Sequence, residues 1–578
     1  MPATPNGRST FIKPTPSSTK VPVVTKKAIS NDYSHHVEDL IRSPLKKRTP
    51  VKMVPALTYM TYMSMTFKNF ISTLIFDWSM AFTHPLHFLA LITLVPLLSF
   101  ALLMIGITFH IGFALGMGSI IEAVGRKWGA NLTMINWWDP SIFTLDVTGI
   151  VKDGISALGR PPQEPADGSD NVVFNIDIAE LLLFMSSIIY ERDEKIVRET
   201  YEMIDDMVAD DTNAEVLESA MNQLKNSVSR IHDQANLWGL EFVSLSELNS
   251  LGGPFSGIFY SKEHNFIVVV FKGTTPIDFK DFVIDLMLQR IDASNFVFGE
   301  IHCGMYTSLF SQTQSRSAKM DRTSPYITIV EAIRSKAVEI VNSNAKNTPV
   351  NVWVTGHSLG AALASIFFSR CLKSPEDLGP NCILRDGYLY GCPAVGNSSF
   401  ASLFSSYSNQ PFDRSSTLWR VVNDTDIVAH LSGFEDITMS QVLANHSILD
   451  YTHVGEEIRF FRSGARPRCT KDVLPPINEH VLVKNNEFGF FKFGKAVVEN
   501  LFYGNPLKKL GELFYSEPFT QPSKYVTSLW QGASHNPLKY VEMMLPIFYR
   551  NHIPAEYFRA MQNARRYFVE NSEDGSIS

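Results

Sequence analysis

Hydrophobic and polar positions divide this chain into stretches of different character. Residues 1–52 are rich in Pro, Ser, Thr and Lys, with too few large apolar side chains to offset the entropy of ordering them. Between Asp77 and Glu122, by contrast, 44 consecutive residues carry no Asp, Glu, Lys or Arg. From residue 172 onward, apolar positions follow helical and strand periods in turn. These patterns predict a disordered tail, a membrane-associated segment and a folded domain.

The expected region boundaries follow these changes of pattern. A stretch rich in Pro, Gly and Asp just before residue 172 reads as the end of a flexible linker. The five regions are a disordered basic tail at 1–52, a membrane-associated or transmembrane region at 53–127, a linker at 128–171, an α/β domain at 172–570 and a disordered C-terminus at 571–578.

The apolar segment is nearly continuous in Leu, Ile, Phe, Ala and Met from Leu86 to Ile121. About 20 apolar residues cross the hydrocarbon core of a bilayer, whereas a helix of this length reaches roughly 54 Å against a core of about 30 Å. Pro96 and several glycines offer positions for a bend. The sequence therefore predicts either one tilted span with an interfacial extension or a hairpin of two half-helices.

The topology follows from which of these two forms is adopted. The tail carries ten Lys/Arg and three Asp/Glu, which places the N-terminus in the cytosol by the positive-inside rule. A single span sends the domain to a lumen, whereas a hairpin keeps it cytosolic and suits a lipid-droplet monolayer as well as the endoplasmic reticulum. We expect a membrane location of one of these two kinds. Lumenal placement would make four glycosylation sequons usable, at Asn131, Asn397, Asn423 and Asn445.

The region from residue 172 alternates helices with strands. Ile176–Tyr190 has the pattern of an apolar amphipathic helix, and Phe255–Tyr260 and Phe266–Phe271 flank a short polar turn, as in a hairpin. Strands separated by helices imply a mostly parallel sheet covered on both faces, so the fold class is α/β. The later expected elements are a helix at Ile327–Val341, a strand at Val350–Thr355, a helix at Ala361–Cys371 and strands at Gly387–Tyr390 and Leu418–Val422.

Charge and cysteine content exclude several function classes. The formal net charge of −7 argues against nucleic acid as a partner, because phosphate binding needs a concentrated basic face. The five cysteines show no CxxC or CxxH spacing, so neither a zinc site nor a disulfide framework is indicated. We expect no metal and no organic cofactor.

A candidate nucleophile stands at the turn between the expected strand Val350–Thr355 and helix Ala361–Cys371. The turn reads Gly356-His357-Ser358-Leu359-Gly360, and a strand–GxSxG–helix context is the requirement for a nucleophile elbow. Such a turn exposes the Ser358 hydroxyl, and the helix N-terminus stabilises negative charge that develops on a substrate oxygen.

Four segments in order resemble the class 3 lipases, fungal triacylglycerol lipases with an α/β-hydrolase fold. The resemblance spans roughly residues 172–570 and implies an α/β-hydrolase domain, a mostly parallel sheet flanked by helices. The four segments are Val270-Phe-Lys-Gly-Thr-Thr275, Val354-Thr-Gly-His-Ser-Leu-Gly360, Tyr390-Gly-Cys-Pro-Ala-Val-Gly-Asn397 and Arg420-Val-Val-Asn-Asp-Thr-Asp-Ile-Val428.

A serine hydrolase of this fold needs an acid and then a base after the nucleophile in the chain. The resemblance places the acid at Asp426, with Asp424 as its rival. It places the base at His552, followed by an aromatic residue at Tyr557, although Asn551 stands where relatives usually have Asp. The other histidines after the acid remain candidates: His535 first, then His430, His446, His453 and His480.

Carbonyl attack also needs two donors aimed at the developing oxyanion. One is the backbone amide of Leu359, the residue after the nucleophile. The resemblance implies Thr274 as the other, with its hydroxyl as a further donor. It also places residues 291–312 where such lipases have a mobile lid.

The sequence thus predicts a membrane-anchored serine lipase that hydrolyses the carboxylic esters of triacylglycerols or diacylglycerols. The triad is Ser358, Asp426 and His552, and the partners are an acylglycerol or phospholipid substrate and a membrane or lipid-droplet surface. A phospholipase A1 or a diacylglycerol-specific lipase would use the same triad. A non-catalytic membrane scaffold with a hydrolase fold is the alternative from another class.

Overall fold

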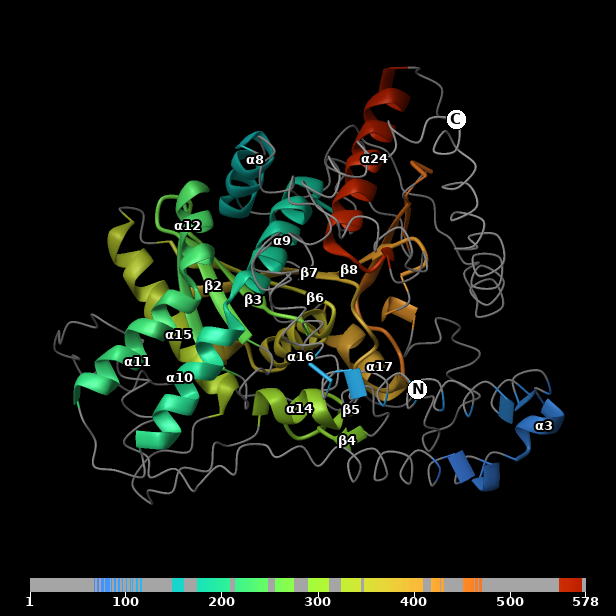
Figure 1. Ribbon diagram of the computed structural model, residues 1–578. Coiled ribbons are helices and arrows are strands. Elements are labelled where there is room, and N and C mark those ends of the chain that lie inside the picture. Colours follow the sequence, from blue (N-terminus) through green and yellow to red (C-terminus); the bar gives the residue numbers. More distant parts are fainter. Residues whose placement is uncertain are drawn as a thin grey trace, which may run out of the picture.

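The computed structural model describes ten segments of the chain together with short runs and single residues between 67 and 116. The described segments are 148–160, 174–207, 214–247, 255–274, 290–310, 324–344, 348–408, 417–430 without Ile427, 451–469 without Arg462 and Arg466, and 550–573. Within them, eight strands form one sheet in the order β1-β2-β3-β6-β7-β8-β9-β10 (Figure 1). The bounds of these strands are β1 Glu241–Glu247, β2 Phe255–Ser261, β3 Phe266–Phe271, β6 Val350–His357, β7 Cys382–Tyr390, β8 Leu418–Asn423, β9 Glu456–Phe460 and β10 Arg468–Cys469.

The centre of the sheet is parallel and its edges are antiparallel. Strands β3, β6, β7, β8 and β9 pair in parallel, whereas β1 and β2 extend one edge as antiparallel neighbours and β10 closes the other. Parallel strands need crossover connections, and the helices between them supply these. The expected strands and the mostly parallel sheet are thereby confirmed.

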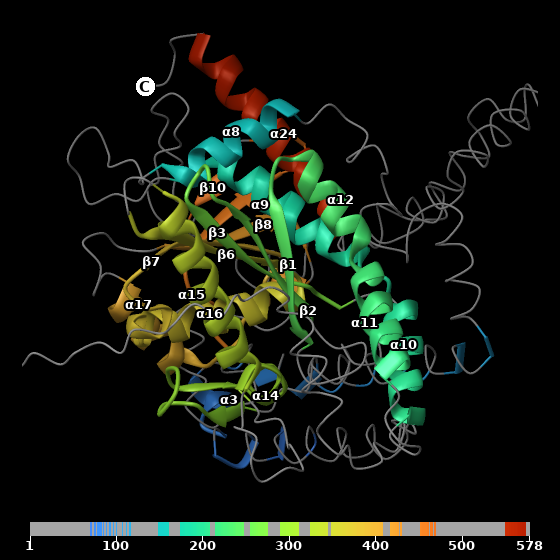
Figure 2. The ribbon, with the colours of Figure 1, turned by 90° about the vertical axis from the view of Figure 1, so that its left-hand side faces the viewer.

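Helices cover both faces of the sheet. Strand β3 shows why both faces are apolar, since alternate residues of Phe266–Phe271 point into two separate clusters of buried side chains. One face is covered by α8 (Thr148–Gly159), α9 (Ile176–Ile188), α12 (Ser229–Leu237) and α24 (Pro554–Glu573), and the other by α14 (Cys303–Phe310), α15 (Pro325–Ser343), α16 (Leu359–Lys373) and α17 (Ser398–Ser408). Helices α10 (Glu194–Met207) and α11 (Ala214–Ser227) lie side by side (Figure 2).

Helix α8 corrects the expectation that residues 128–171 form only a linker. Its residues Val151, Ile155 and Leu158 are buried in the same cluster as α9, and the indole Nε1 of Trp353 donates to the Leu158 carbonyl at 3.2 Å. The folded domain therefore begins before residue 172. Sequence periodicity did not reveal α8 because its apolar stripe is short and adjoins the Pro- and Gly-rich stretch.

Close packing of α8 on α9 depends on Gly154. A Cβ at this position would lie 2.6 Å from the Cβ of Leu181, whereas a Cβ at Gly149 in the same helix would meet nothing within 4 Å. We expect Gly154→Ala to lower the free energy of unfolding by about 1–3 kcal/mol, because the two helices must move apart. Gly149→Ala, the matched control, should leave it unchanged or raise it by up to about 1 kcal/mol. Urea denaturation of both variants checks this, and equal stabilities would contradict the close contact.

The segment expected to act as a lid is built into the core. Residues 290–302 form a two-stranded hairpin of β4 (Arg290–Asp292) and β5 (Glu300–His302), and α14 follows directly. Val297 and Ile301 are completely buried, and Phe298 is 2% exposed. The described part of this segment is therefore packed against α15, α16 and α17 rather than free to open as a flap.

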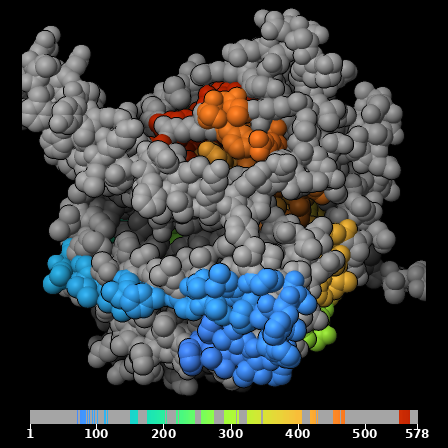
Figure 3. All heavy atoms as spheres, turned by 90° about the vertical axis from the view of Figure 1, so that its right-hand side faces the viewer, coloured from blue at the N-terminus to red at the C-terminus, as the bar shows by residue number. Residues whose placement is uncertain are grey.

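The predicted membrane region lies largely outside the described residues. Its described part comprises the short helix α3 (Met80–Thr83) and isolated residues, coloured blue in Figure 3. Among the residues that the structure describes, no helix combines the length and the hydropathy needed to cross a membrane. Large apolar side chains in this part are nevertheless exposed to solvent, including Phe82 at 78% and Leu115 at 82%.

Candidate active site

The turn between β6 and α16 has the strained geometry of a nucleophile elbow. Ser358 adopts φ 59° and ψ −130°, a conformation that L residues rarely occupy. The two glycines of the motif permit it, since a Cβ on Gly356 would lie 2.4 Å from the Gly360 carbonyl oxygen and one on Gly360 would lie 2.2 Å from the Phe271 carbonyl oxygen. These contacts bring α16 directly against β6 and β3. The Ser358 hydroxyl is thereby presented at the carboxyl end of the parallel strands.

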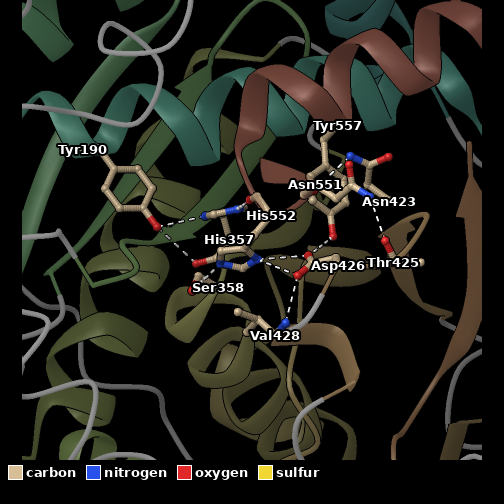
Figure 4. A network of polar contacts seen from close by, with 10 residues as sticks. All are labelled: Tyr190, His357, Ser358, Asn423, Thr425, Asp426, Val428, Asn551, His552 and Tyr557. Carbon is tan, nitrogen blue, oxygen red and sulfur yellow. Dashed lines mark hydrogen bonds and ion pairs between the residues drawn. The ribbon is translucent and has the colours of Figure 1, made fainter. Parts of the chain in front are cut away.

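The structure brings Ser358, His552 and Asp426 together from three distant parts of the chain (Figure 4). The Ser358 Oγ lies 2.9 Å from Nε2 of His552. Nδ1 of the same ring lies 2.9 and 3.0 Å from the two carboxylate oxygens of Asp426. All three side chains are buried, with Ser358 4% and His552 7% exposed. The three side chains are therefore connected by continuous hydrogen bonds, the arrangement that a nucleophile, a base and an orienting acid require.

Asp426 rather than Asp424 contacts the histidine. Its carboxylate accepts hydrogen bonds from the Tyr557 hydroxyl at 2.5 Å and from the Val428 amide at 2.9 Å, besides that from His552. Burial alone would raise the pKa of Asp426, but the charge of His552 and these hydrogen bonds outweigh it and hold that pKa below its usual range. At Asp424, burial prevails over the charge of Arg459 and raises the pKa. Asp426 is thus kept ionised beside the imidazole.

Helix α24 positions the histidine. It begins at Pro554, two residues after His552, and proline is favoured at a helix start because its missing amide has no partner there. The helix is fixed to α9 by Arg565, which pairs with Asp177 at 2.6 Å and with the buried Glu180 at 2.8 Å. The chain between residues 470 and 549 therefore need not place His552, because α24 does so from the C-terminal side.

Asn551 forms a neutral link between the histidine and the acid loop. Its side-chain Nδ2 donates to Thr425 Oγ1 at 3.1 Å, and its backbone carbonyl accepts from Asn423 Nδ2 at 2.9 Å. Asn423 and Asn551 are both completely buried. Because position 551 carries an amide rather than a carboxylate, it adds no negative charge of its own beside Asp426.

Two donors to the oxyanion were expected from Leu359 and Thr274. Leu359 is the first residue of α16, where its amide belongs to the unpaired helix N-terminus. Thr274 follows Gly273, and a Cβ on Gly273 would lie 3.2 Å from the Cβ of Ser358, so this turn borders the nucleophile. The Thr274 hydroxyl oxygen is buried and has no hydrogen-bond partner within the described part of the chain. Its proton is free for a substrate oxygen.

His357 was recognised in the sequence only as part of the elbow motif, yet it contacts the base. Its Nε2 lies 2.8 Å from the His552 backbone oxygen, and its Nδ1 lies 3.0 Å from the hydroxyl of Tyr190. Burial and the neighbouring charge of His552 lower the pKa of His357 to about 3. Tyr190 carried no signal in the sequence, because it lies 167 residues before its partner. Tyr557 was visible only as an aromatic residue after the expected base.

The lowered pKa of His357 predicts acid instability. The unfolded state binds this proton near pH 6.5 and the folded state only near pH 3, so the unfolded state holds more protons in between. Stability should therefore fall as the pH drops from about 6.5 towards 3, by an amount on the order of 4 kcal/mol for this group. His357→Gln removes the titration and should flatten that part of the curve. Urea titrations at several pH values measure this, and parallel curves for the two proteins would refute it.

Comparison with known families supports the geometry over part of the chain. Residues 268–435 match the model of the family described as Lipase (class 3). This segment contains Ser358, Asp426 and Thr274, and it ends before His552. The base therefore rests on the geometry of the structure.

Relatives show the same partial coverage. Triacylglycerol lipase OBL1 of Arabidopsis thaliana is 30% identical over 187 residues, which cover 29% of this chain and 35% of that protein. Triacylglycerol lipase OBL1 of Nicotiana tabacum is 32% identical over 143 residues, 24% of this chain and 23% of that protein. The chain thus spans about a third or less of the length of these two relatives.

Solved structures give a weaker likeness. That of lipase II from Rhizopus niveus is 21% identical in sequence and covers 39% of this chain and 70% of its own, with a TM-score of 0.27. The fold itself follows from the parallel sheet and the elbow described above, an arrangement found in α/β-hydrolases. Over residues 268–435, the chain is therefore similar in sequence to the class 3 lipases, and its sheet and elbow have the α/β-hydrolase arrangement.

Proposed function

We propose that the protein is a serine hydrolase that cleaves the carboxylic esters of acylglycerols. The observation that carries this proposal is the unbroken chain of hydrogen bonds from Ser358 Oγ through His552 to Asp426. The class 3 lipase match at residues 268–435 supports an ester of glycerol as the substrate class. Triacylglycerol and diacylglycerol are the proposed substrates.

The geometry defines the proposed steps. His552 Nε2 takes the proton of Ser358 while Oγ attacks the ester carbonyl carbon, and Asp426 stabilises the imidazolium that forms. The amide of Leu359 and the backbone and hydroxyl of Thr274 donate to the oxyanion. When the tetrahedral intermediate collapses, His552 gives its proton to the departing glycerol oxygen and an acyl-enzyme remains. Water, deprotonated by His552, then attacks the acyl-enzyme and releases the fatty acid.

A direct comparison of substrates tests this function. The detergent-purified protein should release fatty acid from emulsified triacylglycerol or diacylglycerol, and a fluorophosphonate probe should label it and abolish the release. Release from phospholipid in preference to both acylglycerols would support a phospholipase A1 instead. A folded protein that neither hydrolyses esters nor is labelled would support a non-catalytic scaffold.

We also propose that the region at residues 53–127 attaches the enzyme to a membrane or lipid-droplet surface. Exposed large apolar side chains in its described part support this, because water disfavours such a patch on an isolated soluble protein. An enzyme held at an interface meets its lipid substrate without extracting it into water. The supporting residues are Phe67, Ile75, Phe76, Trp78, Phe82, Leu89, Phe100, Ile111 and Leu115, all more than half exposed.

Glycosylation at two of the four sequons can test the membrane topology. Asn397 and Asn423 are buried and hydrogen-bonded, so these two sequons are inaccessible in the folded domain. Asn131 and Asn445 are the sequons to follow. Glycosylation at either one would favour a single span with a lumenal domain. Its absence at a site engineered into the turn at residues 262–265, at the exposed Glu263, would favour a hairpin.

A further inference from the structure

The hydroxyl of Tyr190 points toward His357 of the elbow, next to His552 (Figure 4), and it also lies against Gly273 of the oxyanion turn. Tyr190 belongs to the short helix η2 (Ile189–Glu191), far before the segment that matches the lipase family, and is 1% exposed. Its oxygen lies 3.0 Å from His357 Nδ1 and 3.4 Å from the His357 carbonyl oxygen. A Cβ built on Gly273 would lie only 2.1 Å from this hydroxyl. One side chain thus contacts both turns that surround Ser358.

The direction of each hydrogen bond follows from the chemistry of its partners. The backbone oxygen of His552 can only accept, so the His357 Nε2 at 2.8 Å from it carries a proton. Burial keeps the His357 ring neutral, since its pKa lies at about 3. The lone pair is then on Nδ1, where it accepts the hydroxyl proton of Tyr190. The chain of donation runs from Tyr190 to His357 and on to the backbone of His552.

We propose that Tyr190 is a positioning residue that holds the His357 ring in place and thereby fixes the location of His552 against Ser358. This inference rests on the proposed hydrolase function. Without the tyrosine proton, the buried Nδ1 lone pair of His357 has no donor, and the ring is no longer held from that side. Movement of the ring then weakens the hydrogen bond from its Nε2 to the His552 carbonyl oxygen. The catalytic ring moves away from Ser358 Oγ, which it meets at 2.9 Å.

The segment that carries Tyr190 also fixes the oxyanion turn from the other side. Lys272, one residue before Gly273, is 1% exposed and forms an ion pair with Glu194 at the start of α10. A buried ion pair holds its partners in one geometry because neither charge can be left without the other. Tyr190 and Glu194 therefore both help to hold the turn at Gly273–Thr274 in place. This arrangement makes the 190–194 segment part of the frame of the site.

A double-mutant cycle tests the proposal. Tyr190→Phe should lower kcat for p-nitrophenyl butyrate by about 10- to 100-fold and leave KM nearly unchanged, because a misplaced base slows the chemical step more than binding. In a His357→Gln background the Gln amide donates to the His552 carbonyl, and no imidazole ring remains for Tyr190 to hold. Tyr190→Phe should then cost less than about 3-fold in kcat, since coupled residues give non-additive effects.

Tyr326→Phe is the matched control. Tyr326 is also a buried tyrosine with a hydrogen-bonded hydroxyl, which donates to Asp377 at 2.7 Å in the layer of α15, away from the triad. It should lose comparable stability in urea denaturation and keep the kcat of the wild type. A merely structural role for Tyr190 would make the two variants behave alike.

The outcomes separate this proposal from the function on which it rests. If the enzyme is active and Tyr190→Phe lowers kcat by the same factor in both backgrounds, or leaves kcat unchanged, the positioning role is overturned. If the wild type hydrolyses no ester but reacts with a fluorophosphonate, the lipase function fails and the cycle is measured in labelling rates, with the same criterion. A folded wild type that does neither overturns both.

Discussion

Replacing Ser358 with Ala lowers kcat for ester hydrolysis by at least about 10⁴-fold, which is the expected result for loss of the nucleophile in a triad. His552→Ala should cause a similar loss, because Ser358 Oγ then has no base at 2.9 Å to take its proton. The two losses should not add in the double variant, since the residues act as one unit. Release of fatty acid from emulsified diacylglycerol and labelling by a fluorophosphonate measure both effects.

Two matched variants control this result. Ser365→Ala removes another buried hydroxyl of α16, one that donates to the Ala362 carbonyl at 2.7 Å and has no contact with the triad. His453→Ala removes the one rival histidine whose side chain the structure describes. Both should retain activity within a few-fold of the wild type. Full activity in a folded His552→Ala variant would move the base to another histidine, with His535 the next candidate.

Asp426→Asn should lower kcat by about 10³- to 10⁴-fold with little change in KM. The amide can donate to His552 Nδ1, which favours the wrong tautomer of the ring, and the charge that stabilises the imidazolium is lost. Tyr557 and Val428 also donate to this carboxylate, so some stability is lost as well. Steady-state kinetics beside urea denaturation separates the two effects.

Asp424→Asn is the control for the acid. Asp424 has φ 46°, a left-handed conformation that Asn tolerates well, so the substitution introduces no backbone strain. Its carboxyl group does not contact His552 within the described residues, and we expect kcat to stay within a few-fold. A larger loss in Asp424→Asn than in Asp426→Asn would reverse the assignment of the acid.

Much of the α/β domain was predictable from local pattern. The strand at Phe266–Phe271 and the helix at Ile327–Val341 appear as β3 and α15 with bounds shifted by two residues or fewer. Continuous apolar runs and caps determine such elements within a few residues of chain. Helix α8 and strands β1 and β9 were not predicted, because their burial depends on partners from other parts of the chain.

The candidate site likewise contains one residue that local sequence identifies and one that depends on packing. Ser358 is marked by glycines within two residues on either side, whose backbone contacts leave no room for a side chain, so the sequence alone identifies the turn. Asp426 and its rival Asp424 are the same residue type and lie two positions apart in one loop, so local pattern does not separate them. The resemblance to the class 3 lipases favoured Asp426, and in the structure the packing of α24 places His552 Nδ1 and the Tyr557 hydroxyl on that carboxylate.

The sequence by itself predicted the class of chemistry, the candidate nucleophile and the apolar region before the domain, since each depends on residues that are adjacent in the chain. Tertiary structure decided which acid meets the histidine, that α8 belongs to the domain, and that Tyr190 and His357 lie in hydrogen-bond contact beside His552. The hydrogen bonds among Asp426, His552, His357 and Tyr190 join residues 126 to 195 positions apart. Hydrogen bonds between such residues form only when the sheet and its two helical layers bring them together, so local pattern carries no record of them.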